Sequence, residues 1–485
     1  MISAASRVLQ RFVGLPRRVY DAWRKLEPSR LFTLSFALLI TLGAIGFQVL
    51  PGLYVGESLD WVDSFFTSAS AVCVTGLIVV DTATFFTPAG QAYILVLIQM
   101  GGLGIITFAT WIMLSLGQRL SLRQEDLSID SGVADRVEPA MLIRDVLRFT
   151  ITIEAIGALL LWLLFLPSHD PGAAAWHAVF HAISAFCNAG FSTFSTNLVG
   201  YQENSAILFV VGSLIVAGGL GFLSMSELRL MFHDLRRTRA KRTSYDDLPP
   251  RPRRMTIHTR VVLVTTALLI VSGGVLYLLL EWSVTLSSMG YVDRVANALF
   301  LSVTARTAGF NSVDYGVVSD GGNFLTILLM MIGGSPGSTA GGIKTTTLAL
   351  LVLLAVARLR GRDAVEVAHR TVPERTVQRA VGLMVLVLFV LTIAVFLLVA
   401  VEIGTVPHGQ GHTSFIAVVF EAVSALNTVG LSMGITADLS ALGRWIMIAL
   451  MFLGRVGPMT FAASLSRSVR NPHEVRLPSQ DVLIG

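Results

Sequence analysis

A glycine recurs four times in this chain at nearly equal intervals, each time after a run of small and hydroxyl-bearing residues. The four strings are SASAVCVTGL (68–77), AISAFCNAGF (182–191), LSVTARTAGF (301–310) and AVSALNTVGL (422–431). A cation that leaves water must have its hydration shell replaced, and a ring of backbone carbonyl oxygens replaces it without any fixed charge. Four copies of one short loop around a single axis would supply such a ring.

The residue types of these loops suit that chemistry. Carbonyl groups that point at one axis require unusual backbone angles, and glycine adopts φ > 0 at little cost. A single Gly-Leu or Gly-Phe pair would be ordinary helix punctuation, whereas four at matched spacing favour a shared role. We predict a cation selectivity filter that comprises Val72, Cys73, Val74, Thr75, Gly76, Cys187, Asn188, Ala189, Gly190, Arg306, Thr307, Ala308, Gly309, Asn427, Thr428, Val429 and Gly430. The carbonyl groups predicted to face the ion are those of Val74, Thr75, Asn188, Ala189, Thr307, Ala308, Thr428 and Val429.

The composition indicates that the elements carrying these loops lie in a membrane. Hydrophobic residues make up 53% of the chain and charged residues 14%, whereas soluble proteins average about 25% charged residues. The mean hydropathy is +0.70. Two cysteines in 485 residues exclude a disulfide framework. Because Cys73 and Cys187 occupy the same place in the first two loops, we interpret them as small packing residues rather than as a metal or redox site.

The apolar segments predict one pattern four times: a spanning helix, a shorter apolar segment, the glycine loop and a second spanning helix. About 20 residues are needed to cross the hydrocarbon core, so the shorter segments are predicted to be re-entrant half-helices. Their C-terminal dipole ends would face the axis and favour a cation. The predicted fold is an all-α integral membrane protein with four tandem helix–pore loop–helix repeats around one pseudo-fourfold pore. Its eight spans are expected at 31–50, 88–117, 145–167, 204–232, 258–281, 323–357, 377–402 and 442–464, and its four half-helices at 63–74, 176–187, 293–304 and 412–425.

The same pattern predicts how the chain is divided. The expected units are a basic N-terminus (1–30), repeat 1 (31–117), repeat 2 with its linker (118–232), repeat 3 with its linker (233–357), repeat 4 with its linker (358–464) and a C-terminal tail (465–485).

Positive charge predicts the orientation of the chain. Lysine and arginine gather in the N-terminal segment, the linkers between repeats and the C-terminal tail, most densely in residues 229–260. By the positive-inside rule these segments are cytoplasmic, so both termini are expected inside the cell. The formal net charge of +5 therefore follows from topology, and we expect no nucleic-acid partner.

The last span of repeat 3 contains a segment that cannot form a continuous helix. It reads GGSPGSTAGG (333–342), and glycine and proline each weaken a helix. Because it would lie just inside the filter, we predict a gating loop; a kink or a packing motif of small residues is the alternative. The predicted gating residues are Gly333, Gly334, Ser335, Gly337, Ser338, Thr339, Gly341, Gly342, Lys344 and Arg455.

Three basic residues stand in this apolar region. A charge at mid-membrane costs about 2.5–3.5 kcal/mol, so each should have a partner or face a cavity. We expect Arg455 to lie near the loop and to help hold the closed state, while snorkelling to the interface is the alternative for Lys344. Arg306 stands within the third loop, and we expect it to point away from the axis and to pair with an acid such as Glu421, Asp293 or Glu402.

The segments TARTAGFN (304–311), GGSPGSTAGGIKTTT (333–347) and GRVGPMT (454–460) resemble signature segments of the bacterial Trk and Ktr potassium transporters. The resemblance covers the chain from about residue 31 to 470, and eight expected spans favour the Ktr type over the Trk type. It implies K⁺ as the transported ion, Na⁺ as a candidate modulator, no organic cofactor, and a bacterial plasma membrane location. It also implies a homodimer and a cytosolic ring of nucleotide-binding RCK subunits as the regulatory partner.

Two other functional classes fit the sequence less well. A cation- or proton-coupled solute transporter is the alternative function, but it would need carboxylates within the membrane. The expected spans hold few, and we place Glu154 and Glu227 towards their cytoplasmic ends. An enzyme is not expected, because the chain has no H-E-x-x-H, G-x-S-x-G or Walker motif.

Overall fold

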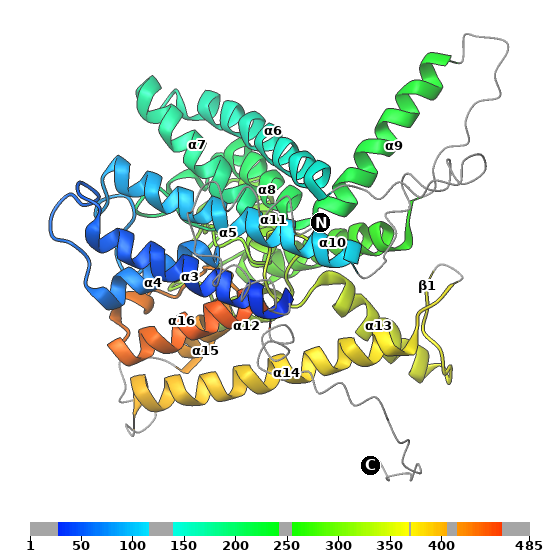
Figure 1. Ribbon diagram of the computed structural model, residues 1–485. Helices are drawn as coiled ribbons and strands as arrows, with labels where there is room; N and C mark the ends of the chain where they lie inside the picture. The colour runs from blue at the N-terminus through cyan, green and yellow to red at the C-terminus, as the bar shows by residue number, and fades with distance from the viewer. Residues whose placement is uncertain (1–27, 116–138, 242–254, 368–369, 405–414, 458–485) are drawn as a thin grey trace, which may run out of the picture.

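The computed structural model describes residues 28–115, 139–241, 255–367, 370–404 and 415–457, and the regular secondary structure of these residues is almost entirely helical (Figure 1). Four successive modules share one order of elements. In module 1, α3 (Pro28–Val49) precedes the short helix α4 (Trp61–Val72), and α5 (Pro88–Ser115) follows the glycine loop. In module 2, α6 (Pro139–Phe165) and the short helix α7 (Pro171–Cys187) precede η1 (Val199–Tyr201), α8 (Ser205–Gly219) and α9 (Phe222–Lys241).

Modules 3 and 4 repeat the order. In module 3, α10 (Ile257–Glu281) and the short helix α11 (Tyr291–Thr304) precede α12 (Asp320–Met330) and α13 (Thr345–Leu359). A two-stranded hairpin of β1 (Glu366–Val367) and β2 (Arg370–Thr371) joins it to module 4. In module 4, α14 (Glu374–Leu398) continues as the π-helix η2 (Val399–Ile403), and the short helix α15 (Phe415–Leu426) precedes η3 (Thr436–Asp438) and α16 (Ala441–Val456).

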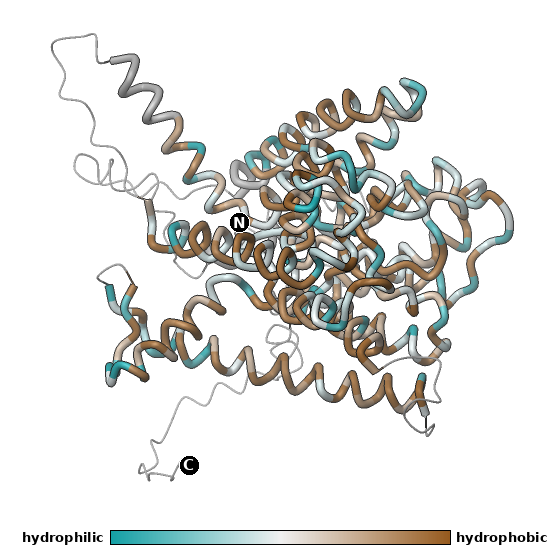
Figure 2. The backbone as a smooth tube through the Cα atoms, turned by 180° about the vertical axis from the view of Figure 1, so that it is seen from behind, coloured by the Kyte–Doolittle hydropathy of each residue, from teal (hydrophilic) through white to brown (hydrophobic). Residues whose placement is uncertain are grey.

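The first helix of each module is long and apolar enough to cross a membrane. Among the described residues these segments are Arg30–Val49, Arg144–Phe165, Ile257–Glu281 and Glu374–Ile403. Large apolar side chains stay exposed on them, such as Leu279 at 74% and Phe396 at 72% exposed. In Figure 2 the outer helices are mostly brown, the colour of hydrophobic residues. Helices with apolar residues on their outward face are typical of proteins whose solvent is lipid.

The second helix of module 2 differs from the expectation of one continuous span over 204–232. The chain bends by 105° between α8 and α9, and the two pieces together form a fifth candidate span. Gly221 at the bend has φ +79°, a left-handed conformation that favours glycine. In Figure 1, α9 leaves the bundle and projects away from it.

The short helices lie inside the bundle and the modules close on themselves. Most residues of α15 and of α4 are buried. The second helix of each module packs against the short helix of the next: α5 contacts α7, α8 contacts α11, α12 contacts α15, and α16 returns to α4. This cyclic order places the four glycine loops around one centre.

Candidate functional site

The four glycine loops adopt the same unusual backbone. The residue two positions before each glycine is left-handed, with φ of 56° at Val74, 60° at Asn188, 67° at Thr307 and 50° at Thr428. Each glycine also has positive φ: 97° at Gly76, 71° at Gly190, 79° at Gly309 and 93° at Gly430. Left-handed valine and threonine are rare because the branched side chain crowds the backbone. The same costly conformation at equivalent positions indicates that the loops share one geometric requirement.

The four glycines form a closed ring. A methyl group placed on Gly76 would collide with the carbonyl of Ala189, and one on Gly309 with the carbonyl of Val429. One on Gly430 would collide with the carbonyl of Thr75, and one on Gly190 would come within 2.8 Å of the Gly309 Cα. Each loop therefore contacts the next, and no side chain fits between them.

Hydroxyl groups on the short helices hold the loops, and the sequence reasoning missed them. In module 1, Ser70 Oγ donates to the Leu77 carbonyl at 2.7 Å and accepts from the Gly76 amide at 3.1 Å. Equivalent bonds run from Ser184 Oγ to the Phe191 carbonyl (2.7 Å), from Thr304 Oγ1 to the Phe310 carbonyl (2.5 Å) and from the Gly430 amide to Ser424 Oγ (3.1 Å). A Ser or Thr is present in each of the four aligned strings, so the signal was available.

Glycines of the second helices clamp the loops from behind, with one exception. Gly101, Gly218 and Gly454 lie so close to the carbonyls of Val72, Phe186 and Leu426, respectively, that any side chain would collide with them. Each of these carbonyls belongs to the residue four positions before the ring glycine. In module 3 the corresponding glycine, Gly333, instead faces the carbonyl of Gly341. In module 3 the glycine therefore contacts the module's own irregular chain segment between α12 and α13 instead of the glycine loop.

That irregular segment, residues 331–344, lies between α12 and α13 and touches two of the four loops. Thr339 Oγ1 donates to the Phe186 carbonyl of module 2 at 3.2 Å. Gly341 lies against Asn427 and Thr428 of module 4, where a side chain would collide with the threonine hydroxyl. The segment therefore lies directly behind the ring.

The bend of module 2 anchors the same segment. The amides of Ser335 and Thr339 donate to the carbonyls of Gly219 (2.9 Å) and Gly218 (3.3 Å), and the Phe222 amide donates to the Gly337 carbonyl at 3.3 Å. The Ser335 hydroxyl also donates to the Leu220 carbonyl. Three of these bonds therefore reach the end of α8 and one reaches the first residue of α9, so the segment is held on both sides of the bend.

The half-buried Lys344 and the buried Arg455 bind three successive carbonyls of the segment. Lys344 Nζ donates to Ala340 O at 2.5 Å and to Gly341 O at 3.3 Å. Arg455, which is 2% exposed, donates through Nη1 to Thr339 O at 2.5 Å and through Nη2 to Gly101 O at 3.3 Å. Lys344 thus folds back onto the segment, and the expected proximity of Arg455 is found. Their role in gating stays a prediction.

The expected ion pair of Arg306 is wrong. Within the described residues Arg306 forms no ion pair, and its Nε is buried without a hydrogen-bond partner. The three acids proposed as partners bind hydroxyl groups instead: Asp293 accepts from Ser205 Oγ (2.6 Å), Glu421 from Thr436 Oγ1 (2.8 Å) and Glu402 from Ser440 Oγ (2.7 Å). These acids therefore bind neighbouring segments of the chain and do not serve as counter-ions for Arg306.

The expected position of Glu154 is also wrong. It lies in the middle of α6 rather than near the N-terminal end, which we expected to be cytoplasmic, and only 6% of it is exposed. Its carboxylate contacts Gln99 of α5, which in turn contacts Cys187 at the end of α7. A carboxylate is therefore buried beside the loop of module 2.

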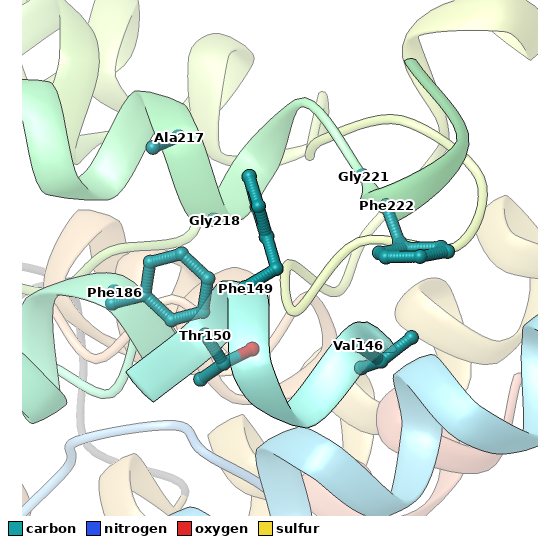
Figure 3. Close-up of a pocket in the computed structure, with 8 residues that line it drawn as sticks. All are labelled: Val146, Phe149, Thr150, Phe186, Ala217, Gly218, Gly221 and Phe222. Carbon is teal, nitrogen blue, oxygen red and sulfur yellow. The ribbon is translucent and has the colours of Figure 1, made fainter. Parts of the chain in front are cut away.

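A small apolar cavity lies between α6 and the bend that joins α8 to α9 (Figure 3). In Figure 3, Phe149, Phe186 and Phe222 lie around this space. It is lined by Val146, Phe149, Thr150, Phe186, Ala217, Gly218, Gly221 and Phe222. Because no charged side chain lines it, we interpret it as packing space next to the bend rather than as a cation site.

Comparison with known proteins gives one consistent result. The model of the family described as "TrkH: Cation transport protein" matches residues 33–475. The potassium/sodium uptake protein NtpJ of Enterococcus hirae is 37% identical over 472 residues, covering 95% of this chain and 98% of that protein. The Ktr system potassium uptake protein B of Bacillus subtilis is 35% identical over 466 residues, covering 96% and 98%. The crystal structure of the potassium transporter TrkH from Vibrio parahaemolyticus matches in fold, with a TM-score of 0.68, 21% identity, and coverage of 91% of this chain and 86% of that one.

Proposed function

From the premise that the chain belongs to the TrkH family of cation transport proteins, we propose that it carries K⁺ into the cell along the axis of its four glycine loops. The observation that carries this proposal is the closed ring of Gly76, Gly190, Gly309 and Gly430. Full-length relatives that are named as potassium uptake proteins support the choice of ion. The family consists of ion transporters rather than enzymes.

The proposed architecture places eight spans and four re-entrant half-helices around this axis. The four long first helices would face lipid, and α4, α7, α11 and α15 would be the half-helices. The second helices would line the pathway, because each packs against the short helix of the following module. In this arrangement the irregular backbone at membrane depth is buried in protein or lines the water-filled path, the only places where it is tolerated.

The loops would act as a selectivity filter. Backbone carbonyls would replace the water around K⁺, and the left-handed residues next to them would turn successive peptide groups towards the axis. The ring glycines allow the four loops to meet, because a side chain on any of them would collide with the backbone of the next loop. No fixed negative charge is needed, so the ion is bound weakly enough to leave again.

The irregular segment of module 3 would be the gate. Residues 333–342 lie directly behind the ring, and Lys344 and Arg455 hold three of the segment's carbonyls. In the closed state these two cations would also repel an incoming K⁺, because charges interact strongly where water is excluded. Opening would require the segment to leave the bend of module 2 and both cations.

The proposed function also implies a membrane, an oligomeric state and a regulatory partner. The chain would lie in a bacterial plasma membrane with both termini in the cytoplasm, as the positive charge of its linkers favours. It would form a homodimer, respond to Na⁺, and be controlled by a cytosolic ring of nucleotide-binding RCK subunits. The names of the Ktr relatives support a multi-subunit arrangement, since they describe a potassium uptake system.

Uptake of ⁸⁶Rb⁺ into proteoliposomes tests the proposed function. Vesicles loaded with K⁺ and placed in K⁺-free medium acquire a negative interior that drives Rb⁺ through an open K⁺ pathway. We expect uptake without any pH gradient, and its loss when a methyl group is placed in the ring by Gly309→Ala. Uptake that occurs only with an imposed pH gradient would instead identify the proton-coupled transporter.

A further inference from the structure

The proposed pathway does not explain why the carboxylate of Glu154 is buried. Both of its oxygens accept from a single donor, Gln99 Nε2, at 3.2 and 3.1 Å. Within the part of the chain that the structure describes, Glu154 has no cationic partner. Burial of a carboxylate with so few hydrogen-bond donors is costly, so we expect this side chain to have a structural or functional role.

The oxygen of the Gln99 side-chain amide connects Glu154 to the glycine loop of module 2. Gln99 Oε1 accepts from Cys187 Sγ at 3.2 Å, and the same sulfur lies 4.0 Å from Glu154 Oε1. Cys187 is the last residue of α7 and directly precedes Asn188, whose φ of 60° begins the left-handed turn of the loop. We call Glu154, Gln99 and Cys187 the module 2 relay. It joins three helices, α6, α5 and α7, from two modules.

The chemistry of the three groups fixes the direction of the relay. Both oxygens of Glu154 accept hydrogen bonds, so the NH₂ side of the Gln99 amide faces Glu154. The amide carbonyl is then turned towards Cys187, where it accepts the hydrogen bond of the thiol. The acceptor oxygens of Glu154 therefore determine which group Cys187 meets, although Glu154 itself does not reach the loop.

Module 4 shows a different solution at the same position. Asn427 corresponds to Cys187, and its Nδ2 donates to the Val423 carbonyl of its own short helix at 2.9 Å. That anchor is local and needs no neighbouring helix. In module 2 the equivalent position depends on side chains from α5 and α6, so its geometry can be changed from outside the loop.

We propose that Glu154 is a positioning residue for the module 2 loop: acting through Gln99 and Cys187, it fixes the start of the turn at Asn188 and sets cation selectivity. This inference rests on the proposed function of the ring. A loop held in one conformation keeps the ring at one size and discriminates against the smaller, more strongly hydrated Na⁺. A loop released from the relay adapts to both ions.

The first test reads the relay directly and does not depend on transport. The chain has only two cysteines, so in the Cys73→Ala background Cys187 carries the single thiol. Its S–H stretching band in the infrared reports the hydrogen bond to Gln99. We expect the band to shift in Glu154→Gln, because glutamine presents both a donor and an acceptor and no longer orients the Gln99 amide. The swapped variant Glu154→Gln/Gln99→Glu should restore a band typical of a bonded thiol, since a carboxylate then accepts the proton.

The second test measures selectivity as the ratio of Na⁺ to Rb⁺ uptake in proteoliposomes. We expect Glu154→Gln to raise this ratio about fivefold, which corresponds to the loss of one hydrogen bond of about 1 kcal/mol. Cys187→Ser keeps a donor and should retain more selectivity than Cys187→Ala. The matched control is Glu227→Gln, which alters another buried carboxylate, on the helix α9. The two oxygens of Glu227 accept from the amide (2.6 Å) and the hydroxyl (2.7 Å) of Thr256.

The two tests separate the relay from the proposed function. An S–H band that is unchanged by Glu154→Gln overturns the relay, whether or not the vesicles take up cations. A shifted band with an unchanged uptake ratio overturns the link to selectivity. Wild-type vesicles that take up neither Rb⁺ nor Na⁺ would refute the proposed function of the ring, and the selectivity role of Glu154 would fall with it. An equal change in Glu227→Gln would show that loss of any buried carboxylate has this effect.

Discussion

Replacement of Arg455 by alanine tests whether fixed cations hold the gate of module 3 closed. The variant loses the bond from Nη1 to Thr339 O at 2.5 Å and the longer bond from Nη2 to Gly101 O at 3.3 Å. A hydrogen bond that involves a charged group contributes about 1.5–3 kcal/mol. With about 2 kcal/mol for the short bond alone, the ratio of closed to open gates should fall about 30-fold.

Electrostatics acts in the same direction. At an effective dielectric constant of about 20, two unit charges about 8 Å apart repel by about 2 kcal/mol, so loss of the guanidinium also lowers the barrier for K⁺. If the wild-type gate is open about 1% of the time, a 30-fold change in the equilibrium raises flux about 20-fold. Saturation of the open state limits any larger increase.

The assay is ⁸⁶Rb⁺ uptake into proteoliposomes in the absence of a cytosolic partner. Arg455→Lys retains a cation and should give an intermediate flux. Arg358→Gln is the matched control, because Arg358 is exposed on α13 and pairs with Asp363 at 3.1 Å, outside the segment. Arg455→Ala protein that is folded and monodisperse but has the wild-type flux would refute the argument that this cation holds the gate.

Three further outcomes follow from the ring and the segment behind it. Gly309→Ala should reduce Rb⁺ uptake more than about tenfold because the methyl group meets a carbonyl of the next loop, whereas Gly56→Ala, which has open space, should retain uptake. Ser335→Ala should raise flux in the same assay about fivefold, since the closed segment loses a buried hydrogen bond of about 1 kcal/mol. Ser424→Ala frees the Gly430 amide and should raise the uptake ratio of Na⁺ to Rb⁺, while a wild-type ratio would show that this hydroxyl does not hold the loop.

The repeated part of the fold could be predicted from the sequence. Short helices are present where half-helices were expected at 63–74 and 293–304, namely α4 (Trp61–Val72) and α11 (Tyr291–Thr304), because short apolar runs before small-residue loops are a local signal. That they are re-entrant stays a prediction. The resemblance to the Trk and Ktr transporters is confirmed by the family match, and so is the expectation that the chain is no enzyme.

The unrepeated part could not be predicted, because it depends on contacts between distant residues. The contact of Glu154 with Gln99 is set by the packing of helices from different modules. Within the described residues the buried Nε of Arg306 has no hydrogen-bond partner, and the local sequence gives no sign of this. The bend between α8 and α9 replaces a helix that hydropathy alone would continue, since its stability depends on carbonyls that receive donors from Ser335 and Thr339. Local patterns carry no information on such pairings.

The contact between α16 and α4 has a consequence for how the protein is made. These helices come from opposite ends of the chain, and Arg444 of α16 donates to Asp63 of α4 at 2.5 Å across 381 residues of sequence. Until loop 4 and α16 have been synthesised, the ring therefore lacks one of its four loops. In the proposed function, a chain at that stage would enclose no ion pathway and would not dissipate the membrane potential of the cell that makes it.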